Sequence, residues 1–280
     1  KAPADGRKGE YLRLIERTFQ EFETEHLHQL LLNTLNDKDY KFDFSKYSKE
    51  TGIPTNSNPN GKQIYYTQIP QTNFSKIPGS PIAYWVSERV LRSFDEENLI
   101  GDIAQVKIGM GTGKNKIFVR DWWEVNHPHI DFTLKNVNEL NNSNGRYFPY
   151  NKGGDYRLWY GNLQQVVWFD STGRNYMNTM SGHRENGGWN YYFKQGLTWS
   201  FISSSKFGVR FLPDGFTFDV AGSMLFIDEN EIKYVLGFLS SVVCFYILPV
   251  LNPTLNFQAG NIKSLPIKPN ANWHGGGKRS

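Results

Sequence analysis

One stretch of the 280-residue chain combines side chains that suit nucleic-acid contact. RYFPYNKGGDYRLWYGN, residues 146–162, interleaves Arg146, Lys152 and Arg157 with six aromatic side chains. Bases stack on aromatic planes, and phosphates pair with guanidinium and ammonium groups. The same composition also fits core aromatics surrounded by solvated charges, so the residues alone leave both interpretations open.

A glycine-rich segment, GMGTGK at residues 109–114, suggests a phosphate-binding loop. A P-loop needs a further Gly five positions before the last one and Ser or Thr after the Lys, whereas this chain has Ile108 and Asn115 there. A dinucleotide fingerprint would need Gly in place of Lys114. We therefore expect a structural turn between two strands.

Two further patterns could hold a metal. Pro213-Asp214 followed by Glu231 and Lys233 resembles the ligand set of Mg²⁺-dependent nucleases, but Glu231 and Lys233 fall in the first turn of a predicted helix and Asp214 in a Pro-Asp-Gly turn. The His pairs at 26/28 and 127/129 lack the Cys or carboxylate partners of a zinc site. We expect neither a catalytic residue nor a metal.

Three helices are predicted to surround these residues. Apolar residues recur at helical spacing from about Glu10 to Asn36, and Ser80 with Pro81 can begin a second helix that reaches about Phe94. Asp228 and Glu231 have capping-box spacing ahead of an uncharged run, which predicts a third helix over 229–248 that ends near Pro249. That run, 234–251, barely reaches the length of a membrane span and is interrupted by Gly, Ser and Pro, so a buried core helix is favoured.

The other elements read as strands. Short β-branched and aromatic runs separated by turn residues predict them at 64–69, 103–108, 116–123, 163–169, 197–203, 207–212, 216–220, 223–227 and 262–267. Their close spacing in the second half suggests one curved, mostly antiparallel sheet. The predicted fold class is α+β, with helices flanking that sheet.

Charge and composition narrow the functional classes. Residues 102–210 carry 13 Lys and Arg against 8 Asp and Glu, a mild cationic excess that suits a polyanionic partner. The single cysteine, Cys244, excludes an intramolecular disulfide and favours a reducing, cytoplasmic location. The chain starts without Met and without an apolar leader, so we expect a cut end of a longer protein.

Five segments together carry a family resemblance. They are FSKIPGSPIAYWVSE (74–88), GMGTGKNKIFVRDWWEV (109–125), YFPYNKGGDYRLWYGN (147–162), GLTWSFISSSKFGVRFLPDGFTFDVAGSMLF (196–226) and LNPTLNFQAGNIKSLPI (251–267). In this order they resemble the region that follows the methyltransferase domain in PglX-like adenine-specific DNA methyltransferases of BREX phage-defence systems and in related type IIG restriction enzymes. FPYNKGG followed by KFGVRFLP and FDVAG is the specific part.

The resemblance implies a DNA target-recognition domain over 74–270, preceded by a helical or linker segment over 1–73 and followed by a flexible basic tail over 271–280. It implies double-stranded DNA, the parent's N-terminal methyltransferase domain and possible defence-system subunits as partners, and no membrane. S-adenosyl-L-methionine is implied for the parent only. The family's glycine motif for that cofactor has no counterpart here, and Asn252-Pro253-Thr254-Leu255 lacks the second Pro and the aromatic residue that grip a flipped adenine. The fragment is therefore expected to select adenine rather than to methylate it.

The leading hypothesis is a sequence-specific DNA-reading module. Its candidate DNA-binding residues are Lys114, Asn115, Lys116, Arg120, Arg146, Tyr150, Lys152, Arg157, Lys206 and Arg210, with Arg174 and Arg184 as weaker candidates. An alternative is a protein-interaction platform of a defence complex, whose exposed aromatics bind a partner subunit or a phage DNA mimic. An independent nuclease that uses Asp214 is the third hypothesis.

Overall fold

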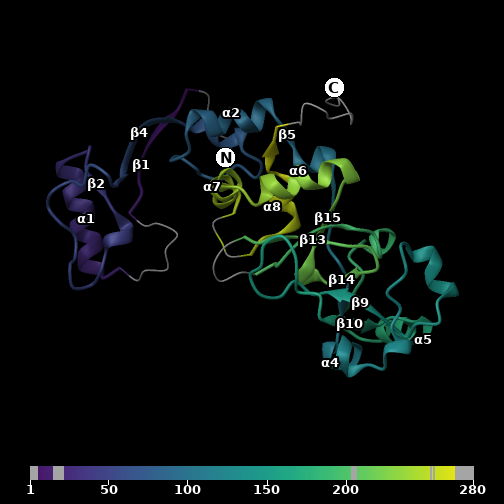
Figure 1. Cartoon of the computed structure of the whole chain (residues 1–280). Coiled ribbons are helices and arrows are strands. Elements are labelled where there is room, and N and C mark those ends of the chain that lie inside the picture. The colour runs from purple at the N-terminus through teal and green to yellow at the C-terminus, as the bar shows by residue number, and fades with distance from the viewer. Residues whose placement is uncertain (1–5, 15–21, 203–206, 253, 255, 269–280) are drawn as a thin grey trace. The chain divides into compact units, whose positions relative to one another are not determined.

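The computed structural model describes residues 6–14, 22–202, 207–252, 254 and 256–268. The chain divides into two compact units, residues 1–95 and 96–280 (Figure 1). The predicted recognition region, 74–270, therefore begins inside the first unit. The predicted basic tail and Lys206 lie outside the described residues.

The first unit is a small α/β unit around aromatic side chains. Helix α1 (Thr24–Asn36) packs through Leu30 on buried Tyr40, Phe42 and Phe44. Phe22 stacks on Tyr47 with ring centroids 4.0 Å apart. Two antiparallel strand pairs complete the unit: β1 (Lys8–Leu12) with β4 (Tyr65–Pro70), and β2 (Lys41–Phe42) with β3 (Lys62–Gln63).

The prediction of one helix over 10–36 is wrong in its first part. Residues 8–12 form β1, and α1 begins only at Thr24. The reason is tertiary: β1 pairs with β4, which is far away in the sequence, and Tyr11 stacks on Tyr84 at 4.6 Å. Apolar spacing cannot register such a partner. The strand predicted at 64–69 is confirmed as β4.

Helix α2 (Glu88–Glu96) begins eight residues after the predicted Ser80 cap. Ser80 has a φ of +47°, in the left-handed region, whereas an N-cap residue has an extended backbone. Ser87 caps the helix instead: its carbonyl accepts from the backbone N–H groups of Val90 and Leu91. The Ser-Pro signal therefore marks a turn and not a helix start.

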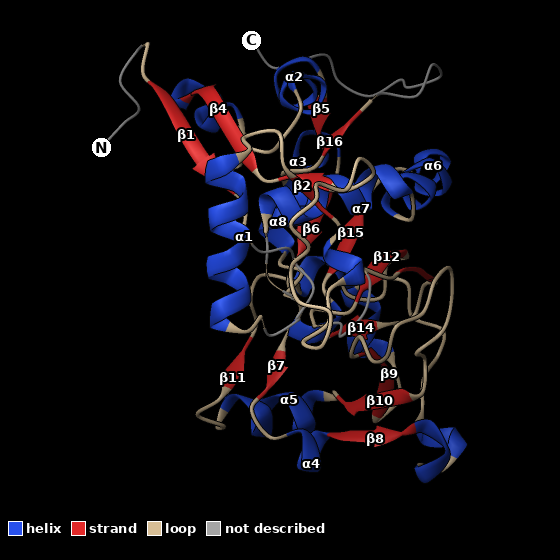
Figure 2. Cartoon of the chain, turned by 90° about the vertical axis from the view of Figure 1, so that its left-hand side faces the viewer, coloured by secondary structure: helices blue, strands red, loops and turns tan. Residues whose placement is uncertain are grey.

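The second unit contains two four-stranded sheets and not the single curved sheet that was predicted (Figure 2). The first, here called the mixed sheet, has the order β14 (Thr217–Phe218), β9 (Tyr147–Asn151), β10 (Gln165–Trp168), β8 (Val119–Asp121). Its β14–β9 pair is parallel. The second, the antiparallel sheet, has the order β13 (Val209–Leu212), β12 (Gly196–Trp199), β15 (Met224–Phe226), β6 (Gln105–Lys107). The mixed α and β content and the largely antiparallel pairing are as predicted.

The glycine-rich segment connects the two sheets. The strands on either side of it, β6 and β8, belong to different sheets and do not pair with each other. Between them, β7 (Gly111–Thr112) pairs with β11 (His183–Arg184), and α4 (Asn115–Phe118) forms one helical turn where a strand was predicted. Gly113 has a φ of +78°, and a Cβ there would lie 2.8 Å from that of Met180, so the turn requires glycine.

The predicted helix over 229–248 is two helices. α6 (Glu229–Leu239) begins at the Asp228 cap, as predicted, but ends at Ser240, and Ser241 caps α7 (Val242–Leu251) by accepting from the Cys244 N–H. The two axes differ by 77°, and within the described residues no helix alone is long and apolar enough to cross a membrane. The remaining elements are α3 (Ile100–Ile103), α5 (Ser171–Asn178), α8 (Ala259–Lys263) and the pair β5 (Asn98–Leu99) with β16 (Pro266–Ile267). Most of the strand predicted at 262–267 is thus α8, and only its end is β16.

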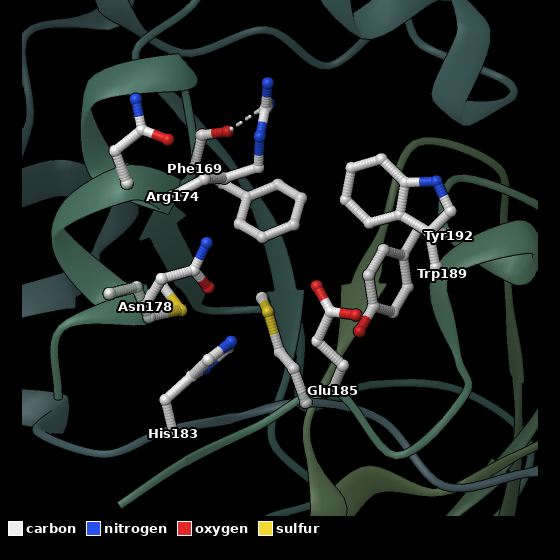
Figure 3. Close-up of a pocket in the computed structure, with 10 residues that line it drawn as sticks. Phe169, Arg174, Asn178, His183, Glu185, Trp189 and Tyr192 are labelled. Atoms are coloured by element: carbon white, nitrogen blue, oxygen red, sulfur yellow. Dashed lines mark hydrogen bonds between the residues drawn. The ribbon is translucent and has the colours of Figure 1, made fainter. Parts of the chain in front are cut away.

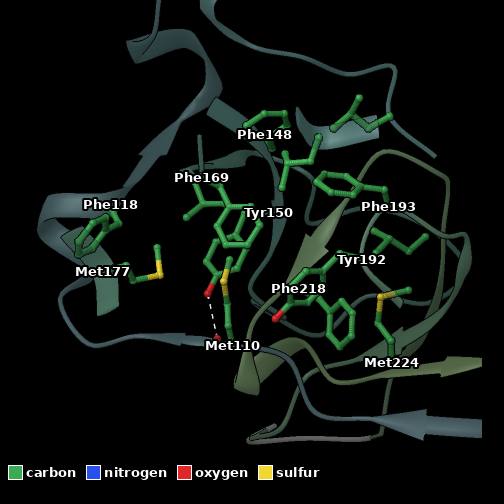
Figure 4. Close-up of a cluster of buried hydrophobic side chains, with 14 of the residues drawn as sticks. Met110, Phe118, Phe148, Tyr150, Phe169, Met177, Tyr192, Phe193, Phe218 and Met224 are labelled. Carbon is green, nitrogen blue, oxygen red and sulfur yellow. Dashed lines mark hydrogen bonds between the residues drawn. The ribbon is translucent and has the colours of Figure 1, made fainter. Parts of the chain in front are cut away.

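The core of the second unit is largely aromatic (Figure 4). Phe148, Tyr150 and Phe218 from the mixed sheet meet Phe193 and Tyr192 from the connection before β12, and all five side chains are buried. The abundance of aromatic residues in the sequence is therefore explained in large part by this core. Aromatics that remain on the surface are the ones available for partners.

Candidate nucleic-acid interface

A cationic surface surrounds the one-turn helix α4. Lys114 is its N-cap residue, Asn115 and Lys116 lie within it, and all three are exposed. Arg120 follows on β8 and is half-buried, and its Nη1 donates to the carbonyls of Lys116 and Val119 at 2.9 and 2.6 Å. Asn115 Oδ1 accepts from the Thr112 hydroxyl at 2.7 Å. Arg120 and Asn115 thus hold the turn, and the two lysines project from it.

Arg146 joins this surface through aromatic packing. It lies just before β9, is exposed, and its guanidinium stands 4.5 Å from the centroid of the Trp168 ring on β10. Trp168 in turn packs against Phe118 of α4 and Tyr176 of α5, with ring centroids 6.0 and 6.1 Å away. We call Lys114, Asn115, Lys116, Arg120 and Arg146 the α4 surface.

Tyr150 and Lys152 serve a buried network instead. Tyr150 is fully buried, and its hydroxyl donates to Asp219 Oδ2 at 2.6 Å and lies 3.2 Å from the Met110 carbonyl oxygen. Lys152 Nζ lies 3.5 Å from the same carboxylate oxygen. Burial, reinforced by Asp219, raises the pKa of Tyr150 well above its usual value. Tyr150 is therefore removed from the candidate interface, and the Lys152 charge is neutralised within the fold.

Arg210 is a second correction, because its side chain is completely buried. Its Nη2 lies 3.2 Å from the Gly153 carbonyl and its Nη1 3.4 Å from Ser200 Oγ, while Nε has no hydrogen-bond partner within the described residues. Burial, followed by repulsion from Arg157, lowers the pKa of Arg210 to about 10. A guanidinium in this position has no surface to offer DNA.

Arg157 belongs to a separate loop over residues 153–162. Asn162 Nδ2 donates to the carbonyls of Gly153 and Asp155, and the backbone of Trp159 bridges to β13, so both ends of the loop are fixed. Arg157, Tyr156, Trp159 and Tyr160 are all exposed on it. The 146–162 cluster of the sequence is therefore divided: Arg146 lies against the mixed sheet and Arg157 on a loop tied to the antiparallel sheet.

The two weaker candidates and the nuclease residues have other partners. Arg174 Nη1 donates to the Phe169 carbonyl, and Arg184 Nη1 to those of Ser181 and His183. Asp214 Oδ1 accepts from the Gln195 N–H. Glu231 lies in the first turn of α6, and no group of three or more His, Cys, Asp or Glu could hold a metal in the part of the chain that the structure describes.

Sequence reasoning missed a cavity of about 210 Å³ between α5 and β11 (Figure 3). Phe169, Trp189 and Tyr192 form an aromatic wall, and Met110 and Met177 line it as well. Its polar lining residues are Arg174, Asn175, Asn178, His183 and Glu185. They come from a stretch of the sequence that resembles an ordinary loop, and no fixed spacing relates them.

Two relatives place the chain among known proteins, although no protein-family model matches it. The sequence is 36% identical over 235 residues to the adenine-specific methyltransferase PglX of Lacticaseibacillus casei (strain Zhang), an alignment that covers 81% of this chain. The chain is homologous to a segment of the PglX-like adenine-specific methyltransferases. The adenine-specific methyltransferase BrxX of Escherichia coli O9:H4 (strain HS) is 33% identical over 204 residues, or 71% of the chain.

The chain spans only part of these PglX-like relatives. The alignments cover 19% of the Lacticaseibacillus protein and 16% of the Escherichia coli protein. Roughly four fifths of each relative therefore lies outside the comparison. The name of the whole enzyme does not by itself say what this segment contributes to it.

Proposed function

We propose that this segment binds duplex DNA for a PglX-like adenine-specific methyltransferase and that the α4 surface holds the phosphates. The observation that carries the proposal is the free cationic charge there. Lys114, Lys116 and Arg146 are exposed, and none of them forms an ion pair with any described residue. Phosphate contacts position a protein on DNA, while side chains on neighbouring loops read the base edges.

The proposal assigns the chemistry to the rest of the enzyme. The methyl donor, S-adenosyl-L-methionine, and the transfer to adenine N6 would belong to a methyltransferase domain of the parent chain, with the segment choosing the site. Further defence-system subunits could join this assembly in the cytoplasm, where the DNA is. The names of the two relatives support a methyltransferase system, and the recognition role rests on the α4 surface.

Fluorescence-anisotropy titration of the full chain against a labelled duplex, at 25 to 200 mM salt, tests the proposal. Each phosphate contact releases counterions, so log affinity falls linearly with log salt with a slope of about −0.9 per contact. Arg146→Ala and Lys116→Ala are each expected to reduce the steepness by about 1. Lys233→Ala removes an exposed charge on α6 and is the matched control.

Two results would contradict the proposal. One is the absence of binding at 25 mM salt. The other is equal slopes for Arg146→Ala, Lys116→Ala and Lys233→Ala, which would mean that only net charge and not the α4 surface matters.

The loop over residues 153–162 favours protein interaction as a second candidate function. Trp159 and Tyr160 expose 54% and 58% of their surfaces on a loop whose ends are fixed, which is the arrangement of aromatic anchors in protein interfaces. A defence-complex partner that still binds the Arg146→Ala, Arg157→Ala double variant in a pull-down, but not Trp159→Ala, would support it. Loss of the partner in the double variant would favour DNA as the bridge.

A further inference from the structure

The cavity between α5 and β11 has the lining of a site for a small flat ligand. Phe169, Trp189 and Tyr192 pack edge to face or tilted against one another, with ring centroids 5.8 to 6.1 Å apart. A volume of about 210 Å³ is below the roughly 300–1,000 Å³ of sites for drug-sized molecules. A single heterocycle fits that size, and aromatic side chains bind such rings by stacking.

The polar groups around the cavity are not used by the fold. Asn175, Asn178 and the Glu185 carboxylate make no side-chain hydrogen bond or ion pair with the residues that the structure describes. The Tyr192 hydroxyl is buried and has no partner there either. A buried hydroxyl without a partner costs free energy, so its position on the wall of a cavity points to a ligand that accepts from it.

His183 has a fixed tautomer at the same cavity. Its Nδ1 lies 2.9 Å from the Gly111 carbonyl oxygen, which can only accept, so Nδ1 carries the hydrogen. In the neutral ring Nε2 is then an acceptor. Figure 3 shows Asn178 and His183 on one side of the cavity and Glu185, Trp189 and Tyr192 on the other. Donors and acceptors thus face a ligand from two sides.

From this arrangement we propose that the cavity binds a nucleobase that carries an exocyclic amine, as adenine does. The aromatic wall stacks on the ring, the Glu185 carboxylate accepts from the amine, and the Tyr192 hydroxyl donates to a ring nitrogen. Acidic side chains accept from base amines, and Asn forms paired hydrogen bonds with adenine. A base extruded from DNA and a free nucleoside share this chemistry. Only the first source depends on the proposed DNA-binding function.

The cavity also lies next to the α4 surface in the fold. His183 on β11 pairs with Thr112 on β7, and Gly113, which follows, directly precedes Lys114. Phosphates held at Lys114 and Lys116 would thus place a nucleotide near the cavity. A base pocket beside phosphate-binding residues is the arrangement that an extruded nucleotide requires.

The test compares two bases that differ in the amine. Deoxyadenosine and deoxyinosine, which carries a carbonyl in place of the amine, are titrated into the full chain by ligand-observed NMR. Duplexes with one extrahelical adenine or hypoxanthine, and a fully paired duplex, are compared by anisotropy. The chain is expected to prefer the adenine member about tenfold, since one good base contact gives about 1–3 kcal/mol and tenfold is 1.4 kcal/mol.

Glu185→Gln is expected to remove the preference, because an amide can donate to the carbonyl as well as accept from the amine. Tyr192→Phe should weaken both ligands without lowering the stability of the fold, since that hydroxyl has no partner to lose. Glu229→Gln, which changes an exposed carboxylate on α6, is the matched control and should leave the preference intact.

The outcomes separate the two proposals. A Glu185-dependent preference among nucleosides supports a free nucleobase site, and one seen only among duplexes supports an extruded base. Equal binding of adenine and hypoxanthine in both arms, or a preference that Glu185→Gln leaves unchanged, overturns the cavity proposal. Binding of the fully paired duplex and its response to Lys116→Ala report on the α4 surface independently.

Discussion

The two four-stranded sheets of the second unit treat their arginines in opposite ways. Arg146, at the mixed sheet, lies on the face of Trp168 and remains exposed. Arg210, on β13 of the antiparallel sheet, is buried with two long hydrogen bonds and an unpartnered Nε. Both occur in segments that carry the family resemblance or border them, and both are plausible DNA contacts by residue type. Burial alone separates a residue that can bind a partner from one that belongs to the fold.

The same comparison applies to the aromatic residues. Tyr150 and Trp159 stand nine positions apart in the cationic cluster, yet Tyr150 is fully buried and Trp159 is 54% exposed. The difference follows from the strand β9, whose residues 148–151 are buried, and from the loop after it. Composition can therefore identify the region of an interface but not its members.

The largest expected effect comes from removing the free cations of the α4 surface together. Lys114→Ala, Lys116→Ala, Arg146→Ala should weaken duplex binding about 100-fold at low salt, or about 2.7 kcal/mol, and should make the salt slope shallower by about 3. Anisotropy titrations at several salt concentrations measure both. Lys233→Ala, Lys263→Ala, Lys268→Ala removes the same net charge from exposed positions elsewhere, and a similar loss in this control would refute the assignment.

The buried network of the mixed sheet should show the reverse behaviour. Asp219→Ala removes the acceptor of the Tyr150 hydroxyl and of the Ala221 N–H and leaves Lys152 unpaired, so the free energy of unfolding should fall by about 2–3 kcal/mol. Urea unfolding measures it. The salt slope of DNA binding should not change under conditions where the variant is folded, and a shallower slope would return Lys152 to the interface. Asp219→Asn keeps an acceptor and should lose less.

Arg210 and the buried tyrosines should act against each other in alkali. Because the pKa of Tyr150 is raised, the unfolded chain loses that proton first and stability falls as pH rises above about 10. The pKa of Arg210 is lowered to about 10, so the folded chain releases that proton first and stability rises between about 10 and 12.5. Arg210→Met should therefore lose stability more steeply than the wild type above pH 10, by up to about 1.4 kcal/mol per pH unit.

Urea midpoints from pH 8 to 11.5 would check this. At pH 7 the substitution should change the free energy of unfolding by less than about 1 kcal/mol, because the buried charge has no carboxylate partner to lose. Parallel pH profiles for Arg210→Met and the wild type would show that Arg210 is solvated in the folded chain. It would then be available to DNA after all.

Sequence reasoning succeeded where a pattern is local. The strands at 65–70, 165–168, 209–212 and 224–226, and the Asp228 cap of α6, follow from periodicity and capping chemistry. It failed where distant partners decide. β1 exists because β4 pairs with it, and β6 and β8 join different sheets because each finds a partner far along the chain. The cavity had no local signal, since its walls meet only after α5, β11 and the turn at Trp189 have packed.

The smallest effect tests whether Arg146 contributes its plane as well as its charge. Arg146→Lys keeps one positive charge and should keep the salt slope, but an ammonium loses the flat guanidinium that rests on Trp168 and can form paired bonds with a phosphate. A cation–π contact at an exposed site is worth about 0.5–1 kcal/mol, so affinity should fall about 2- to 5-fold. Lys116→Arg, which has no aromatic ring beneath it among the described contacts, should change affinity little. If Arg146→Lys binds as the wild type does, Trp168 does not orient Arg146, and only the charge of Arg146 distinguishes it from the buried Arg210.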